Sequence, residues 1–434
     1  MRAVLVLLVL GLVGFGLYRL LPASDVEGKG PEEPAIPFIE RPQEDPGPFG
    51  RGGQPAADRP AKQVEAPRTE PSKSAGAFGL KAGDASSGAT QDVGLAQALF
   101  FGGLADVQRA VARLEPSDAE RRLFLSFANA VTGNQRAAIE AATGLDEAGA
   151  LPAADQALLK AALTGRQVVA ATPASTASEP LARRAMRLRL RALEAERALA
   201  DGQPALAAVA YSDVLKAALT GPWDGDRRAL LAWTEGLNAA QARHRWSPRG
   251  EWASVEMVVE QGDSLTSIRK RYLAEHPDGL ICTGLIARAN QLTGYIHPGD
   301  TLRVPTEHAW AFVDLSSRWL LYLIGDEVAS AWEVGIGREG QETILGEFRA
   351  AEKQEEPTWF REGEQPAYFP DNPLGTRWIA WFRDGQKTSY GFHGTWEPES
   401  IGSASSDGCV RLRNEEVEVL FEILPVGARI LVQQ

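Results

Sequence analysis

An abrupt change of hydrophobic periodicity near residue 250 divides this sequence into a helical part and a β-rich part. Between residues 93 and 247 apolar side chains recur at i, i+3 and i+4, as in Leu95, Ala98 and Leu99, which predicts amphipathic helices. After residue 308 short apolar stretches alternate with turn residues, which predicts strands. A chain of 434 residues is too long for one hydrophobic core, so several domains are expected.

The first 92 residues are expected to lie outside these cores. Arg2 is followed by an apolar stretch to residue 21, which predicts a transmembrane signal anchor or a cleaved signal peptide at 1–21. We favour the anchor, because no small-residue cleavage site is clear after Leu21. Residues 22–92 are rich in Pro, Gly, Glu and Ser and are expected to form a disordered linker. The chain is therefore predicted to be exported.

Turn signals divide residues 93–247 into about six or seven helices of hairpin length. The breaks are expected where Pro, Gly, Asn and Asp interrupt the pattern, near residues 116, 133, 152, 173, 201 and 221. This all-α region resembles a tetratricopeptide-like solenoid, although a clean period of about 34 residues is absent. A compact helical bundle is an equally good interpretation. In either form the region is expected to act as a spacer or to bind a protein partner.

Residues 252–306 form a separate segment whose pattern predicts strand, helix, helix, strand. Residues 262–265, Asn290 and the closing residues 299–305 form a characteristic series of motifs in it. These motifs resemble those of a LysM module, a small α+β unit that binds glycans containing N-acetylglucosamine. It implies a glycan-binding site formed by Asp263, Ser264, Leu265 and Asn290. The alternative is that these residues only form turns and helix caps, since Asp263 is well placed to cap a helix.

Residues 308–434 predict a β-dominated domain of ordinary size. Strands are expected at 311–315, 319–324, 329–334, 346–348, 378–381, 390–393 and 429–432, and a helix only at about 414–423. Residues 351–377 are expected to form a long loop that includes Trp359 and Tyr368. This loop is either a lid over a site or an ordinary surface loop.

Cys409 and His393, sixteen residues apart, are the candidate catalytic pair. A thiolate attacks carbonyl groups well but is scarce at its ordinary pKa of about 8.5, so a neighbouring imidazole is needed to take the proton. The N–H groups of Gly408 and Cys409 could stabilise an oxyanion. Spacing alone is weak support, because most free cysteines are buried and unreactive.

The order His393, Gly394, a gap, then Ser406, Asp407, Gly408, Cys409, Val410, Arg411 resembles the signature of the L,D-transpeptidase (YkuD-like) catalytic domain. The resemblance implies a β-sandwich-like fold, Cys409 as nucleophile, His393 as general base and a carbonyl of Gly394 that orients the imidazole. It places four residues at the substrate: Tyr390, Thr395, Ser406 and Arg411. The alternatives are that Ser406 serves only the turn and that Arg411 pairs with a buried acid.

Asp407 departs from the family pattern, in which a histidine is common at this position. A carboxylate that faced the sulfur would raise the thiol pKa and lower its reactivity. The other cysteine, Cys282, stands in an apolar run and is expected to be core.

The family implies a transferase that forms an acyl-enzyme on Cys409 with a peptidoglycan stem tetrapeptide, releases D-alanine, and cross-links stems or attaches a protein to the wall. The alternatives are an L,D-carboxypeptidase or cross-link hydrolase, and a non-catalytic peptidoglycan-binding scaffold. The location implied is the cell envelope, anchored in the inner membrane. No cofactor is expected, and the histidines lack metal-ligand spacing. A net charge of −12 argues against nucleic acid as a partner.

Overall fold

The computed structural model describes residues 93–434, apart from 115–116, 146–150, 152, 165–179, 223–225 and 360–371. The predicted membrane segment, the predicted linker and the middle of the predicted 351–377 loop lie outside the described residues. Among the residues that are described, none of the helices combines the length and the apolarity that crossing a bilayer requires.

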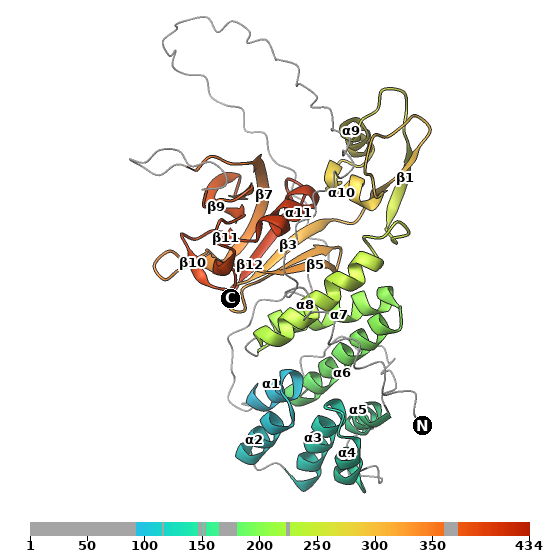
Figure 1. The fold of residues 1–434 in the computed structure, drawn as a ribbon, viewed down its shortest axis with the longest axis vertical. Helices are drawn as coiled ribbons and strands as arrows, with labels where there is room; N and C mark the ends of the chain where they lie inside the picture. Colours follow the sequence, from blue (N-terminus) through green and yellow to red (C-terminus); the bar gives the residue numbers. More distant parts are fainter. Residues whose placement is uncertain are drawn as a thin grey trace, which may run out of the picture. The chain divides into compact units, whose positions relative to one another are not determined.

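Eight helices occupy the described part of residues 93–243, so the predicted helical region is confirmed. Figure 1 shows how they follow one another. They are α1 (Val93–Phe101), α2 (Leu104–Leu114), α3 (Asp118–Val131), α4 (Gln135–Ala142), α5 (Ala153–Thr164), α6 (Leu181–Ala200), α7 (Pro204–Thr220) and α8 (Arg227–Arg243). Ser117 and Glu120 form a capping box that begins α3. The break between α1 and α2 was not predicted. It falls at Gly102, where a β-carbon would lie 2.7 Å from the carbonyl oxygen of Ala98.

The segment around residues 254–305 has the predicted order of strand, helix, helix, strand. Its elements are β1 (Ser254–Val258), α9 (Leu265–Glu275), α10 (Thr283–Ala289) and β2 (Thr301–Pro305), and the two strands pair antiparallel. Ile268, Leu285 and Val304 are fully buried between them. The Sγ of Cys282 donates to the carbonyl oxygen of Glu422 at 3.1 Å, so this thiol lies where the segment contacts helix α11 (Asn414–Ile423).

Eight of the remaining described strands form one sheet in the order β11-β9-β8-β7-β12-β3-β4-β5, which confirms the β-dominated domain. Figure 1 shows these strands together in the C-terminal part of the chain. The bounds are β3 (Ala309–Asp314), β4 (Trp319–Ile324), β5 (Glu327–Glu333), β7 (Gly346–Glu355), β8 (Arg377–Arg383), β9 (Gln386–His393), β11 (Val410–Arg411) and β12 (Arg429–Gln433). A two-stranded parallel pair, β6 (Ile336–Gly337) and β10 (Ala404–Ser406), stands beside it. A short 3₁₀ helix, η2 (Pro398–Ser400), lies between β9 and β10.

Two expectations for this domain need correction. Eight of the described strands of this domain form one large curled sheet, where a sandwich-like arrangement was expected. This sheet curls until its ends meet, because Gly335, just beyond β5, exchanges backbone hydrogen bonds of 2.9 and 2.8 Å with Arg411 of β11. Residues 351–355, predicted as loop, continue β7, because they pair with β8 despite their polar sequence.

Strand β4 lies between two apolar layers, which explains why all six of its residues are buried. The side chains of Trp319, Leu321 and Leu323 belong to the core that also contains the helices α1–α8. The alternate side chains, Leu320, Tyr322 and Ile324, belong to the core shared with α11 and the small segment. The sheet is therefore packed on both faces.

The outer edge of β5 is bonded to side chains of the helical region. Asn238 of α8 bonds both backbone groups of Ala331, at 3.0 and 3.2 Å, and Gln241 donates to the carbonyl of Val328 at 2.7 Å. The N–H of Val328 donates to Ser212 of α7 at 2.9 Å. These bonds satisfy an edge that would otherwise be open to pairing. The helical region therefore packs against the edge of the sheet. The interpretation of this region as a spacer did not include such packing.

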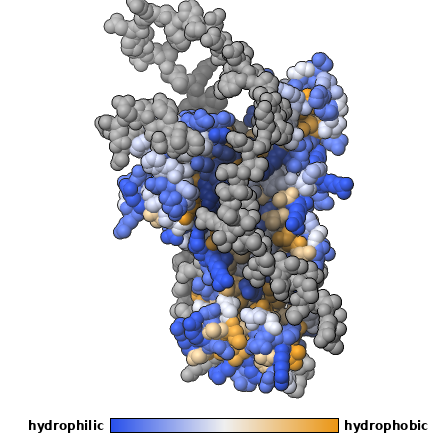
Figure 2. All heavy atoms as spheres, viewed as in Figure 1, coloured by the Kyte–Doolittle hydropathy of each residue, from blue (hydrophilic) through white to orange (hydrophobic). Residues whose placement is uncertain are grey.

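Polar side chains cover most of the described surface in the face that Figure 2 draws, with apolar patches that are small and separate. The exposed large apolar side chains are likewise scattered, for example Ile139, Val258 and Tyr295. Isolated apolar residues of this kind are normal on a soluble protein surface and indicate no site by themselves.

Candidate active site

His393 is the last residue of β9, and its imidazole is 4% exposed. Its Nδ1 lies 2.6 Å from the carbonyl oxygen of Gly394. A carbonyl can only accept, so Nδ1 carries the proton and Nε2 keeps a free lone pair. Trp378 of β8, paired with His393 in register, stacks on the ring at 5.9 Å between centroids. The strand pair thus presents an oriented imidazole with one basic nitrogen.

The pKa of His393 is lowered to about 4. Burial is the main cause, because it disfavours the charged ring, and the nearby cation of Arg411 adds to the effect. The hydrogen bond to Gly394 acts in the opposite direction. The imidazole is therefore neutral at pH 7, which is the form that can accept a proton.

Cys409 immediately precedes β11, which pairs in parallel with β9 so that Arg411 lies opposite His393. This register brings Cys409 level with Gly391, two residues before the histidine. The Sγ donates to the carbonyl oxygen of Ser389 at 3.6 Å. Burial raises the thiol pKa to about 11, while the backbone of Gly391 and the charge of Arg411 lower it. The resting pair is therefore a neutral thiol and a neutral imidazole.

Ser406 holds the turn that leads to Cys409. Its hydroxyl is 1% exposed, donates to the carbonyl oxygen of Cys409 at 2.6 Å, and accepts from the N–H of Gly408 at 3.2 Å. Both bonds are internal to the loop, so Ser406 is engaged in the turn. The N–H groups of Gly408 and Cys409 were predicted to bind an oxyanion. The N–H of Gly408 donates to Ser406 in this structure, so Cys409 supplies the other of the two donors.

Gly408 has a φ of +108°, a conformation that side chains rarely adopt. A β-carbon there would also lie 2.8 Å from Cε1 of Tyr390, so the ring of Tyr390 rests directly against the turn. The structure therefore brings Tyr390 to the nucleophile loop. Glycine is required at 408 both for backbone conformation and for space.

Arg411 is a cation with weak partners beside both candidate catalytic groups. Its side chain is 15% exposed, and its Nη1 lies 3.5 Å from Ser405 Oγ and 4.0 Å from a carboxylate oxygen of Glu397. Its Nε is buried without a hydrogen-bond partner. Glu397 is half exposed, so the alternative of a pair with a buried acid finds no support in this contact. The positive charge lowers the pKa of both His393 and Cys409.

The side chain of Asp407, the departure from the family pattern, points to Arg338. The two form an ion pair of 2.7 Å, with Asp407 73% exposed. Its charge raises the pKa of Cys409 but is the last of the four causes. Asp407 is thus exposed and paired with a cation, and it has the smallest of the four effects on the thiol pKa.

Thr395 is buried in the turn after β9, where its hydroxyl accepts from the N–H of Glu397 at 3.0 Å. Its own N–H donates to Oδ1 of Asn414 at 3.1 Å. It therefore holds the turn and does not face an open surface. Sequence reasoning missed Asn414 and Trp378. The only signal for Asn414 was its place at the start of the predicted helix, and Trp378 was assigned only to a strand.

The three polar residues predicted to bind glycan, Asp263, Ser264 and Asn290, all form hydrogen bonds within their own segment. Asp263 accepts from the N–H of Glu260 at 2.9 Å and from Ser267 at 2.7 Å. Ser264 caps α9, and Leu265 is half buried against the core. Asn290 accepts from the N–H of Arg303 at 2.9 Å and so ties the end of α10 to β2. These bonds give each polar residue a structural role, and binding of a sugar stays a prediction.

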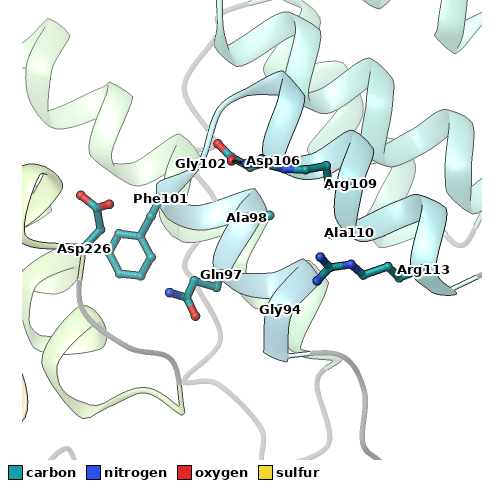
Figure 3. Close-up of a pocket in the computed structure, with 10 residues that line it drawn as sticks. All are labelled: Gly94, Gln97, Ala98, Phe101, Gly102, Asp106, Arg109, Ala110, Arg113 and Asp226. Carbon is teal, nitrogen blue, oxygen red and sulfur yellow. Dashed lines mark hydrogen bonds and ion pairs between the residues drawn. The ribbon is translucent and has the colours of Figure 1, made fainter.

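A pocket of about 400 Å³ lies in the helical region, between α1, α2 and the residue that caps α8 (Figure 3). Its polar lining includes Asp106, Arg109 and Asp226, and Asp106 and Arg109 form an ion pair with each other. None of the residues predicted for chemistry or glycan binding lines this pocket. It brings no nucleophile together with a base.

Comparisons with known proteins find one family in the C-terminal part of the chain. Residues 308–432 match the model of the YkuD L,D-transpeptidase catalytic domain. The chain is 36% identical over 124 residues to YqjB of Bacillus subtilis, a protein classed with the L,D-transpeptidases, covering 28% of this chain and 70% of that protein. It is 28% identical over 183 residues to YkuD of the same organism, covering 41% and 97%. The catalytic domain of an E. faecium L,D-transpeptidase is similar to 29% of this chain over 97% of its own length, with 24% identity and a TM-score of 0.24.

Proposed function

This chain belongs to the L,D-transpeptidase family, and on that premise we propose that it is an exported peptidoglycan transpeptidase acting through a thioester on Cys409. One observation carries the proposal: a neutral His393, with Nδ1 fixed on Gly394, lies on the strand beside the Cys409 loop. An oriented base beside a thiol is what nucleophilic acyl transfer requires.

In the proposed first half-reaction, Nε2 of His393 takes the proton of the Cys409 thiol. The sulfur then attacks the carbonyl carbon of the third residue of a stem tetrapeptide. The N–H of Cys409 donates a hydrogen bond to the oxyanion. The N–H of Gly408 exchanges its bond to Ser406 for a second bond to the oxyanion. The C–N bond breaks as His393 returns the proton to the leaving D-alanine amine. A thioester remains on Cys409.

In the second half-reaction, the amine of a neighbouring stem, or of a wall protein, attacks the thioester. His393 takes a proton from the attacking nitrogen, the C–S bond breaks, and the sulfur recovers that proton. The free enzyme is restored and an amide cross-link has formed. Water as the acceptor would give a carboxypeptidase or a hydrolase on the same site, so the acceptor decides between these reactions.

Arg411 is proposed to attract a carboxylate of the donor stem. Its weak contacts and its buried, unbonded Nε support this role, because a cation in such surroundings gains from a new anionic partner. The same charge would stabilise the Cys409 thiolate as it forms. Tyr390 is proposed to form a side of the donor site, since its ring rests on Gly408. Thr395 and Ser406 are proposed to support the site through their turns.

The rest of the chain is proposed to bring this site to the wall. Residues 252–306 would bind glycan as a LysM module, which raises the local concentration of stems. Residues 1–21 would anchor the chain in the inner membrane, with 22–92 as a linker and the remaining domains in the periplasm. The helical region could additionally bind a protein partner.

The test is the intact mass of the protein after incubation with a carbapenem and, separately, with tetrapeptide muropeptides. We expect one covalent adduct on the wild type and on Cys282→Ala, and none on Cys409→Ala. With muropeptides, release of D-alanine together with a cross-linked dimer supports transpeptidation. Tripeptide monomer without dimer would replace it by the hydrolytic reaction. A wild type that forms no adduct would overturn the proposal in favour of the non-catalytic scaffold.

A further inference from the structure

Asn414 lies at the first position of α11, and its side chain takes no part in starting that helix. The helix start is capped by Arg413 and Glu416, whose backbone and side chains bond each other. The Oδ1 of Asn414 instead accepts two hydrogen bonds from other segments, from the N–H of Thr376 at 3.2 Å and from the N–H of Thr395 at 3.1 Å. One side-chain oxygen thus joins the start of β8 to the turn after β9.

Two glycines leave the space that this oxygen occupies. A β-carbon on Gly375 or on Gly394 would overlap Oδ1 of Asn414 in either case. The amide therefore lies directly against the backbone of both residues, and Gly375 also has a φ of +62°. Two hydrogen bonds and two close glycine contacts hold the Gly394 peptide from one side.

We infer that Asn414 is a positioning residue that sets the tautomer and orientation of His393 through the carbonyl of Gly394. That carbonyl oxygen lies 2.6 Å from Nδ1 and accepts the hydrogen bond of the buried ring. A peptide free to rotate would turn the carbonyl away. The proton would then move to Nε2 in part of the molecules, and those molecules would lack a base facing the sulfur.

The inference rests on the proposed function only for its kinetic consequence, since the ring geometry can be measured without turnover. The chain has five histidines, so ¹⁵N signals of the imidazoles can be resolved and that of His393 assigned with His393→Gln. In the wild type we expect the Nδ1–H tautomer. In Asn414→Leu, which keeps the size but loses the acceptor, we expect the ¹⁵N shifts to move toward a tautomer mixture. Asn414→Asp keeps the acceptor oxygen and should restore the wild-type pattern.

Acylation by a carbapenem supplies the second readout. Asn414→Leu should acylate 10- to 100-fold more slowly, by analogy with the loss of a residue that orients a catalytic group, and Asn414→Asp should recover most of that loss. The matched control is Asn238→Leu, which also removes a side-chain bridge to a strand backbone. It should lower the melting temperature without moving the His393 signals.

The outcomes separate the two proposals. If wild type forms no adduct but Asn414→Leu still shifts the tautomer, the positioning role stands and the transpeptidase proposal fails. If Asn414→Leu is folded by near-ultraviolet circular dichroism and keeps the wild-type imidazole signals, the positioning role is overturned. The same holds if Asn414→Leu and Asn238→Leu shift the His393 signals alike. Should the leucine variant not fold, Asn414→Ser, which is smaller and leaves an acceptor out of reach, is measured in its place.

Discussion

The loop that carries Cys409 and the turn that carries His393 meet on neighbouring strands, but they are held in different ways. Ser406 holds the cysteine loop through bonds to Gly408 and to Cys409 itself, within three residues. Asn414, nineteen residues beyond Thr395, holds the histidine turn. The cysteine loop is thus braced by a side chain of its own, in addition to the 3.0 Å bond from the N–H of Arg338 to the carbonyl oxygen of Ser406. The histidine turn is braced by a side chain from a helix that follows in the chain. Substitutions in the Cys409 loop should therefore have different measurable effects from substitutions in the His393 turn.

The largest effect is expected from removing the base. His393→Gln should slow acylation of Cys409 by about 10²- to 10⁴-fold, the usual contribution of general base catalysis. The measurement is the rate of adduct formation by intact mass. His308→Gln, at an exposed position, is the control and should react at the wild-type rate. If His393→Gln were acylated at the wild-type rate, His393 would not be the general base.

The contributions of His393 and Cys409 to stability should also be lost at opposite ends of the pH scale. Folding holds the pKa of His393 near 4, below its ordinary 6.5, so unfolding takes up a proton between these values. Stability should be full above pH 6.5 and fall by up to about 3 kcal/mol as the pH drops to 4. Chemical denaturation across this range, with His393→Gln as the reference, measures the difference. Parallel curves for wild type and variant would contradict the prediction.

For Cys409 the sign is reversed. Its pKa in the folded protein is about 11, above the ordinary value of about 8.5, so its contribution to stability is present below about pH 8.5 and lost as the pH rises toward 11. The loss should be smaller than that for the histidine, because the thiol is partly exposed. Cys409→Ser, measured by denaturation at pH 8 and 10, should lack it. Thiolate absorbance near 240 nm should appear with the same midpoint.

A side chain at Gly408 should distort the cysteine loop. Gly408→Ala combines a positive φ with a contact on Tyr390, and strain of this kind costs about 1–3 kcal/mol. We expect a lower denaturation midpoint and acylation at least about tenfold slower. Gly340→Ala is matched to it, because Gly340 has a φ of +80° but no neighbour within 4 Å. Equal losses in both variants would show that the tyrosine contact is without effect.

The smallest effect concerns Ser406. Ser406→Ala leaves the N–H of Gly408 and the carbonyl of Cys409 without their partner, which costs about 1–2 kcal/mol of unfolding free energy. The exposed neighbour Ser405→Ala should change it by less than about 0.5 kcal/mol. Urea denaturation compares the two. A negligible effect of Ser406→Ala would mean that the loop is held from outside, like the histidine turn.

The same contrast explains how much the sequence could predict. Cys409, His393 and Gly408 stand in one stretch that resembles a family signature, and this resemblance, more than their spacing, was the basis for proposing them. Asn414 acts across the fold, and nothing in its own neighbourhood marks it. Period-2 and period-3.6 patterns predicted the strands and helices, since both patterns are local.

The arrangement of these elements was beyond local pattern. The apolar face of α8 has the same spacing whether it packs on another helix or on β5, so its contact with the sheet could not be inferred. The curl of the sheet depends on a pairing between Gly335 and Arg411, which are distant in the chain. Polar residues 351–355 extend β7 because β8 pairs with them, an influence that outweighs their weak intrinsic preference for strand.

The bonds between α8 and β5 bear on how this protein could be divided. Residues 308–434 taken alone would uncover the backbone groups of Val328 and Ala331 together with the apolar side chains of Trp319, Leu321 and Leu323. Such a strand is a template for another copy to extend the sheet. Glu333, whose side chain is only 3% exposed, would also lose its ion pair with Arg227. We therefore expect residues 308–434, prepared without the helical region, to associate through this uncovered strand.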